Sequence, residues 1–309
     1  MLQTFVTTVY QVFLPISLPV IGGALIKHFK PIDTKPISTL SLYLLSPALI
    51  FETLIGADIS YGEITDTVLF TVLNMLLLWG IAVGIGKAWS LPAAEQSGLT
   101  LTALFTNCVN YGLPLVLLAF GQAGLDKASV YVILQIIIVN TLGVYFAARS
   151  QFSVKQAALS IFKLPSIYAA VLAVICRTAH VELPQELNQG ISMISSAYSS
   201  VALFILGAQM VSVRSGKTAY TAAMNKAFYA GLAMRLVISP VASALLLYLL
   251  GIQGVLFNVM LVLSSMPAAV NAVILAEQFD AAPKVVTRCI LWTTLASFVL
   301  LPLMIGWLG

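Results

Sequence analysis

The chain has 309 residues, of which 60% are hydrophobic and only 8% are charged, and its formal net charge is +4. Soluble domains usually carry about 25% charged residues, so a soluble fold of this length has too little interior for so much apolar surface. No stretch combines basic and aromatic residues in the way that nucleic-acid-binding surfaces do. The composition therefore predicts a polytopic membrane protein whose first partner is the lipid bilayer.

Ten apolar runs are long enough to cross a bilayer, which takes about 20 residues in a helix. Their lengths suit helices and not the short alternating strands of a barrel. The connections between the runs are short, so we expect an all-α protein of ten transmembrane helices with no appended soluble domain. The predicted helices span residues 4–26, 37–57, 65–88, 97–121, 128–148, 161–180, 190–213, 227–250, 254–276 and 283–308.

The positive charges are distributed unevenly over the connections. Of the 15 Lys and Arg residues, twelve lie in the odd-numbered connections, and only Lys127 and Arg177 lie in the even-numbered ones. Cytoplasmic loops are enriched in Lys and Arg, so we expect a multi-pass protein of the cell (inner) membrane with both termini outside. The remaining cation, Arg235, lies about two turns inside the eighth helix. It either extends to the cytoplasmic surface or binds a carboxylate or a broken-helix carbonyl.

Weak internal similarity relates the two halves of the chain. The segment FLPISLPVIGGALIK (13–27) resembles KLPSIYAAVLAVICR (163–177), and VNTLGVYF (139–146) resembles WTTLASFV (292–299). Five is an odd number, so a five-helix unit repeated in series must enter the membrane from opposite sides. Residues 1–150 and 151–309 are therefore predicted to be inverted repeats, an architecture of secondary transporters.

Proline and asparagine interrupt the fourth and ninth helices, which correspond in the two repeats. Pro114 lies in FTNCVNYGLPLVLLAFG, and Pro267 lies in SSMPAAVN. Proline frees the carbonyl four residues earlier, here that of Asn110 or Leu263, and broken backbone is tolerated in a membrane only inside protein or beside water. We expect two broken helices that cross at the bilayer midplane and direct half-helix ends at a ligand. The alternative is a pair of kinked helices with internally satisfied asparagines.

Motifs along nearly the whole chain resemble the auxin efflux carrier family. TNCVNYGLPL is similar to the fourth-helix pattern of the family, VILQIIIVNTLGVYFAAR to the fifth-helix pattern, and MRLVISP and MPAAVNAVILAEQF to those of helices 8 and 9. The resemblance implies a binding asparagine at Asn107, a crossover proline at Pro114 and a binding glutamine at Gln135. The chain differs from plant members at Ile50, where they have serine, and at Ser166, where they have a binding asparagine.

What the resemblance implies is export or exchange of organic anions. The implied fold is the crossover fold of sodium–proton antiporters and bile-acid symporters, with a scaffold domain (helices 1, 2, 6 and 7) and a transport domain (helices 3–5 and 8–10). Elevator-like alternating access and a homodimer formed through the scaffold are implied as well. The coupled ion, a proton or sodium if there is one, stays open.

The predicted substrate pocket is polar and nearly uncharged. Amides and helix ends bind a carboxylate less tightly than a buried arginine would, so the anion can be released. A neutral site also lowers the free-energy cost of moving the empty binding site across the membrane. The expected substrate is a small carboxylate such as malate, malonate or an auxin-like acid. Glu52 in the second helix is either an interfacial carboxylate or the coupling group. The candidate substrate-binding residues are Ile50, Asn107, Asn110, Tyr111, Gln135, Ser166 and Asn271.

The sequence lacks the residues that several other classes of function require. Cys108, Cys176 and Cys289 form no CxxC motif, so neither a metal site nor a disulfide is expected, and no cofactor is implied. No HExxH motif or other protease constellation is present, which argues against an enzyme. Two alternatives stay open: a sodium- or proton-coupled antiporter or symporter of the same fold, and a channel or membrane receptor.

Overall fold

The computed structural model describes residues 9–30, 32–56, 59–148, 165–179, 181, 183–213 and 221–308. Within these residues the chain is helical apart from short connections and one isolated antiparallel bridge. The prediction of an all-helical protein is confirmed. The predicted cytoplasmic link between the two halves, 149–163, lies outside the described residues.

The first half of the chain contains α-helices joined to π-helical segments, which are labelled η. Its elements are η1 (Val9–Phe13), α2 (Leu14–Phe29), α3 (Lys35–Leu40), η2 (Ser41–Leu45), α4 (Ser46–Gly56), α5 (Tyr61–Ala88), α6 (Ala93–Leu104), η3 (Cys108–Gly112), α7 (Leu113–Ile138), η4 (Val139–Gly143) and α8 (Val144–Ala148). The fourth and fifth predicted helices meet inside α7 at Gly121. Its φ of 65° belongs to a conformation that favours glycine, so the helix is interrupted there.

The second half is helical as well, and its described residues include one π-helical segment, compared with four in the first half. Its elements are α10 (Pro165–Thr178), α11 (Gln185–Val213), α12 (Ala222–Ala233), η5 (Met234–Ile238), α13 (Ser239–Leu249), α14 (Gly254–Ser264), α15 (Asn271–Gln278) and α16 (Pro283–Leu308). Across the described residues, 6 helices are long and apolar enough to cross a membrane, and α2, α10 and α14 are shorter apolar helices. The chain is therefore a multi-pass membrane protein.

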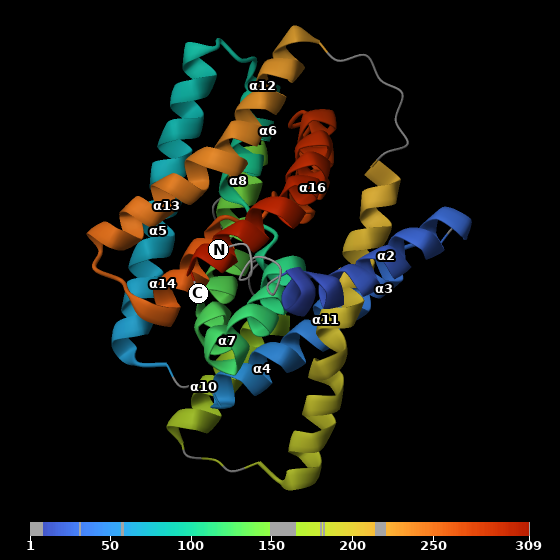
Figure 1. Ribbon diagram of the computed structural model, residues 1–309, viewed down its shortest axis with the longest axis vertical. Helices are drawn as coiled ribbons and strands as arrows, with labels where there is room; N and C mark the ends of the chain where they lie inside the picture. The colour runs from blue at the N-terminus through green and yellow to red at the C-terminus, as the bar shows by residue number, and fades with distance from the viewer. Residues whose placement is uncertain are drawn as a thin grey trace.

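The helices pack as two groups. One group contains α2, α4, α10 and α11, and the other contains α5, α6, α12, α13, α14 and α16, while α7 contacts members of both (Figure 1). In the first group α2 and α11 cross at glycines: a Cβ on Gly23 would overlap the carbonyl oxygen of Phe204, and one on Gly207 that of Val20. Small residues allow this close approach of two membrane helices.

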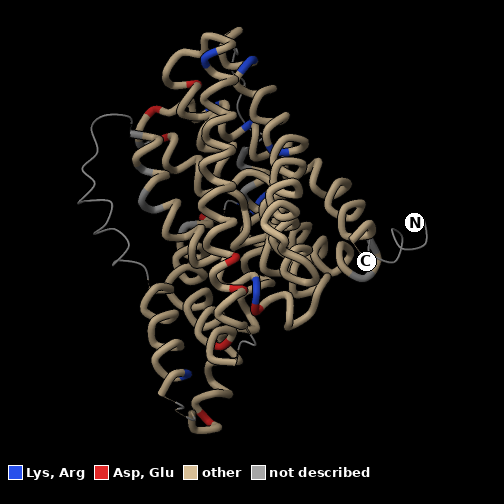
Figure 2. Tube along the Cα trace, turned by 90° about the vertical axis from the view of Figure 1, so that its left-hand side faces the viewer, with Lys and Arg blue, Asp and Glu red and all other residues tan. Residues whose placement is uncertain are grey.

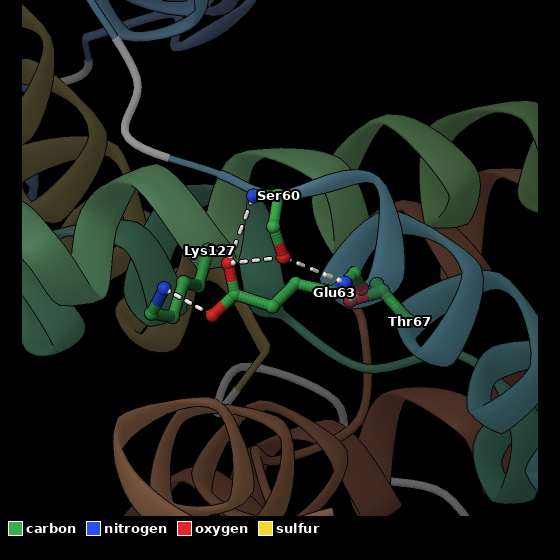
Figure 3. A network of polar contacts seen from close by, with 4 residues as sticks. All are labelled: Ser60, Glu63, Thr67 and Lys127. Atoms are coloured by element: carbon green, nitrogen blue, oxygen red, sulfur yellow. Dashed lines mark hydrogen bonds and ion pairs between the residues drawn. The ribbon is translucent and has the colours of Figure 1, made fainter.

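Charged residues are sparse along the length of the molecule, and Lys and Arg gather mainly toward one end (Figure 2). A polar network at the start of α5 joins this helix to Lys127 of α7 (Figure 3). Ser60 and Glu63 form a reciprocal capping box at the start of α5, and the Glu63 carboxylate accepts an ion-paired hydrogen bond from Lys127. The network therefore brings together two connections that the charge pattern places on the same side of the membrane.

Candidate functional site

Two extended segments replace helix where the fourth and ninth predicted helices were expected to break. Residues 105–107 follow α6, and residues 266–268 follow α14; Thr106 and Ala268 form an antiparallel bridge. The N–H of Asn107 donates to the carbonyl oxygen of Pro267 at 2.8 Å, and the N–H of Ala269 donates to that of Phe105 at 2.8 Å. Backbone groups freed by one break are thus satisfied by the other, as the membrane interior requires.

The two prolines occupy different places relative to these breaks. Pro267 lies inside the extended segment, whereas Pro114 lies in the first turn of α7, beyond η3. The break expected at Pro114 is therefore located at Thr106 and Asn107 instead. The physical reason is that η3 and α7 form one continuous helix from Cys108, and the π-helical turn in which the N–H of Leu113 donates to Cys108 lets the chain pass through Pro114 without a break. The carbonyl of Leu263 is also not free, because it accepts from the N–H of Met266 at 3.4 Å.

Arg235 binds the carboxyl-terminal ends of both broken half-helices. It is only 1% exposed, and η5 places it between α12 and α13. Its guanidinium donates to the carbonyl oxygens of Ala103 at the end of α6, Ser264 at the end of α14 (3.4 Å) and Met266 (3.3 Å). It also donates to the hydroxyl of Ser239 at 3.2 Å.

The environment of Arg235 compensates its charge. The carboxyl end of a helix carries roughly −0.5 of an elementary charge, and two such ends meet at this guanidinium. An extension of the side chain to the cytoplasmic surface is wrong, and of the alternatives the broken-helix carbonyls are the ones observed. The arginine fixes both half-helices, α6 from the first half and α14 from the second, to the helix formed by α12, η5 and α13.

A cavity of about 530 Å³ lies on the side of the crossing away from Arg235, where η3 and α15 begin. The described residues that line it include no charged side chain. Its lining comes from the crossing, from α7, from the α3–η2–α4 segment and from α11. The polar lining residues are Thr34, Ser38, Thr39, Ser41, Ser46, Thr106, Asn107, Asn110, Gln135, Tyr198 and Asn271.

Four buried polar atoms of this lining have no hydrogen-bond partner within the described residues. They are the hydroxyl of Thr106, the amide nitrogen of Asn107, the amide oxygen of Gln135 and the hydroxyl of Tyr198. The Gln135 nitrogen donates to Tyr131 at 3.1 Å, which leaves its oxygen for the cavity. A buried polar group without a partner costs about 1–3 kcal/mol, so these atoms require water or a ligand.

The other predicted site residues are divided between the cavity and the protein interior. Asn110 and Asn271 line the cavity, as do Asn107 and Gln135. Ser166 is buried beside it and shares a hydrogen bond of 3.3 Å with Ser46, a lining residue.

Ile50 and Tyr111 do not reach the cavity. Ile50 packs in a separate apolar cluster with residues of α10 such as Ala170 and Ala173. Tyr111 is fully buried, stacks on Phe298 with ring centroids 5.9 Å apart, and accepts a hydrogen bond of 3.5 Å from Ser297.

Glu52 also lies away from the cavity. It is half-buried on α4, and its carboxylate accepts a hydrogen bond from the hydroxyl of Ser195 on α11. The contact links two helices of the same packing group.

Tyr198 and the hydroxyl groups of α3 and η2 were missed by the sequence analysis. Ser38 and Ser41 lie three residues apart in the second predicted helix, and Thr34 lies four residues before Ser38, just ahead of that helix, so the three follow the spacing of one helix face. That spacing could have indicated a polar face. Tyr198 gave only the weaker signal of a single phenol within an apolar run.

Comparison with known proteins decides the family. The profile of a family described as "Membrane transport protein" matches residues 4–157 and again residues 149–305. The chain belongs to this family, which includes the auxin efflux carriers. The two matches together cover nearly all of the sequence, and they divide the chain into two repeated halves.

Several relatives of this auxin efflux carrier family member are similar over their whole length. An uncharacterized transporter of Methanothermobacter thermautotrophicus is 28% identical over 308 residues, which is 95% of this chain and 96% of that protein. An uncharacterized transporter of Methanocaldococcus jannaschii is 26% identical over 96% of this chain and 98% of its own.

A plant protein matches over part of the chain. A probable auxin efflux carrier component of Oryza sativa subsp. japonica is 24% identical over 153 residues, or 46% of this chain and 39% of the plant protein. The protein is therefore a membrane transporter and not an enzyme, as the sequence predicted.

Proposed function

We propose that this member of the auxin efflux carrier family is a secondary transporter that moves a small organic carboxylate by alternating access. The observation that carries the proposal is the polarity of the crossing: the amino-terminal half-helix ends face the cavity, and the carboxyl-terminal ends are bound by Arg235.

The electrostatics of the crossing favour an anion in the cavity. Each amino-terminal end contributes roughly +0.5 of an elementary charge, and Arg235 removes the opposing field of the carboxyl-terminal ends. The amide nitrogen of Asn107 adds a donor without a partner. Because no charged side chain lines the cavity within the described residues, a carboxylate binds there without the deep well that would prevent its release.

The proposed architecture has ten transmembrane helices in two inverted repeats, residues 1–150 and 151–309, with the crossover fold of sodium–proton antiporters and bile-acid symporters. Several of these spans combine more than one helical segment, among them α6 with α7 up to Gly121, the rest of α7 with α8, and α14 with α15. The packing group of α2, α4, α10 and α11 corresponds to the scaffold domain, and the other group to the transport domain. Lipid-facing apolar residues on α2 and α10 offer the scaffold a surface for a homodimer.

The structure suits a state that is open to the cytoplasm. The cavity extends from the crossing along η2 and α3 to Thr34, next to the connection that carries Lys27 and Lys30. Toward the outside the path from the cavity is closed, because Ile50 and Leu54 in the outer half of the second helix pack against α10. An elevator-like movement of the transport group along the scaffold would carry the crossing to the outer side.

Arg235 also bears on the coupling ion. A cation-coupled carrier of this fold remains the alternative, but the position between the carboxyl-terminal half-helix ends is filled here by a fixed guanidinium. The arginine favours transport or exchange of the anion without sodium or a proton. A channel or receptor is disfavoured by a cavity that is closed by packing toward one side.

The proposal is tested by ligand-dependent melting and by flux. Malate, malonate, lactate and indole-acetate are added separately to the purified protein, and one that binds the folded state must raise its melting temperature. The acid with the largest shift is then followed into proteoliposomes. Saturable uptake with counterflow is expected, with no requirement for a sodium or pH gradient. No stabilisation by any acid, or flux that does not saturate, would contradict an anion carrier.

A further inference from the structure

We infer that Tyr198 is a substrate-contacting residue that acts on one side of the transport cycle only. The inference rests on the proposed function and adds a residue whose phenol would hold the carboxylate in the cytoplasm-open state. Neither the motifs of the sequence nor the similarity to other transporters pointed to this residue.

The position of Tyr198 is unusual for a lipid-embedded tyrosine. Its side chain is 0% exposed, the residue is one of those that line the cavity, and its buried hydroxyl has no partner among the described residues. Buried tyrosine hydroxyls usually find a hydrogen-bond partner, and an orphaned one carries a desolvation cost. The helix that carries it, α11, also packs against η3, the segment that begins just after Asn107. Tyr198 therefore lies on a helix that packs beside the amino-terminal half-helix end at which a carboxylate would bind.

The packing of the helices separates Tyr198 from the other orphaned groups. Tyr198 belongs to α11, which packs on α2 and α4 in the scaffold group. Thr106, Asn107 and Gln135 belong to the crossing and to α7, which move with the substrate in the proposed mechanism. A contact between the substrate and Tyr198 is consequently broken when the transport group moves, whereas the contacts to Asn107 and Gln135 are kept.

The expected strength follows from the chemistry of the pair. A phenol that donates to a carboxylate makes a hydrogen bond to a charged group, which contributes roughly tenfold or more in affinity. Tyr198→Phe removes this oxygen and keeps the ring in its packing. Without ligand, the variant also loses an unsatisfied buried hydroxyl, so its melting temperature should be equal to or higher than that of the parent.

The experiment uses malate as the probe in inside-out and right-side-out membrane vesicles, whose orientations are known. Half-saturation constants are measured from each side with no malate on the other. For Tyr198→Phe, the ratio of the cytoplasmic to the outer half-saturation constant should rise about tenfold over the parent ratio. The matched control is Tyr248→Phe, an exposed tyrosine on α13 that should leave the ratio unchanged.

Each other result has a definite meaning. If the parent transports malate and Tyr198→Phe leaves the ratio unchanged, Tyr198 is a packing residue and the inference is wrong. A lower melting temperature with equal weakening from both sides would also overturn it, because a structural role acts on both states. If the parent shows neither saturable malate flux nor stabilisation by malate, the proposed function fails for this substrate, and the role of Tyr198 fails with it.

Discussion

The backbone N–H of Asn107 donates to the carbonyl oxygen of Pro267 at 2.8 Å, and this bond joins the broken helices of the two halves of the chain. It places the residue that the auxin efflux carrier motif singles out directly at the crossing. The backbone of Asn107 makes the bond to Pro267, so its side-chain amide is not needed to join the two segments. The amide nitrogen is therefore available in the cavity. The geometry thus separates the structural role of this residue from its proposed binding role.

Replacement of Asn107 should separate these two roles. Asn107→Ala keeps the backbone bond to Pro267 and removes an amide nitrogen that has no partner among the described residues. We expect transport to be lost while the melting temperature without substrate changes little. Flux per folded molecule and melting are measured on the same sample, with Asn188→Ala, an exposed asparagine of α11, as the control. Unchanged flux in Asn107→Ala would return the residue to a purely structural role.

Removal of the Arg235 guanidinium should destabilise the protein strongly. Arg235→Met would leave the carbonyls of Ala103, Ser264 and Met266 without this partner inside the protein. Each buried acceptor left without a partner typically costs about 1–3 kcal/mol. Arg235→Lys keeps the charge but cannot donate to as many acceptors, so an intermediate loss is expected.

Chemical or thermal unfolding checks this expectation against Arg177→Met, which removes an exposed arginine near the end of α10. A change within about 0.5 kcal/mol is expected for such a surface position. Equal effects of the two methionine variants would mean that Arg235 does not hold the half-helices together.

The sequence was sufficient for the class, the family and the two helices that are broken. Asparagine and proline in two apolar runs are costly in lipid, so their presence in FTNCVNYGLPLVLLAFG and SSMPAAVN predicted breaks that the structure contains. The exact position of the first break could not be predicted, because it depends on pairing between Thr106 and Ala268. Pro114 does not mark the break, because the helix that begins with η3 continues through it.

Helix faces were harder to predict than helix positions. Ile50 follows η2, and Tyr111 lies inside η3. A π-helical segment accommodates an extra residue and rotates the side chains that follow relative to a regular helix. The sequence does not show where such a segment lies, so it did not show that Ile50 and Tyr111 lie away from the cavity. The partners of Arg235 are equally hidden, because Ala103 and Ser264 are distant in sequence.

The role of Glu52 is open to a direct test. Its carboxylate binds Ser195 on α11, within the same packing group, and does not line the cavity. We therefore expect Glu52→Gln to leave the pH dependence of transport intact, although it could weaken the contact between α4 and α11. The measurement is flux across a range of pH values for parent and variant. A flattened profile in Glu52→Gln would identify the carboxylate as a proton-coupling group.

The proposed topology predicts which positions an impermeant thiol reagent can reach in intact cells. In a background without Cys108, Cys176 and Cys289, single cysteines at Gln185 and Gln253 should be labelled, because both lie in connections predicted to be outside. A cysteine at Ala93, at the start of α6, should be labelled only after the cells are opened. Labelling of Ala93→Cys in intact cells would reverse the orientation or change the number of spans.

Replacement by alanine should affect stability and transport differently at Pro114 and at Pro267. Pro114 lies where η3 passes into α7, and an added N–H there can donate to a carbonyl of the preceding turn, so Pro114→Ala should change stability by no more than about 1 kcal/mol and should retain transport. Pro267 lies in the buried extended segment that accepts from Asn107. Pro267→Ala adds a buried N–H that needs a partner, at about 1–3 kcal/mol if none is found, and it also loosens the segment.

We therefore expect Pro267→Ala to lower both the melting temperature and the flux per folded molecule, with Pro114→Ala as its matched control. The comparison is informative because both substitutions remove the same ring and differ only in its place relative to the crossing. If Pro114→Ala abolished transport and Pro267→Ala did not, the functional break would lie at Pro114. The pairing of Asn107 with Pro267 would then be a feature of the scaffold and not of the binding site.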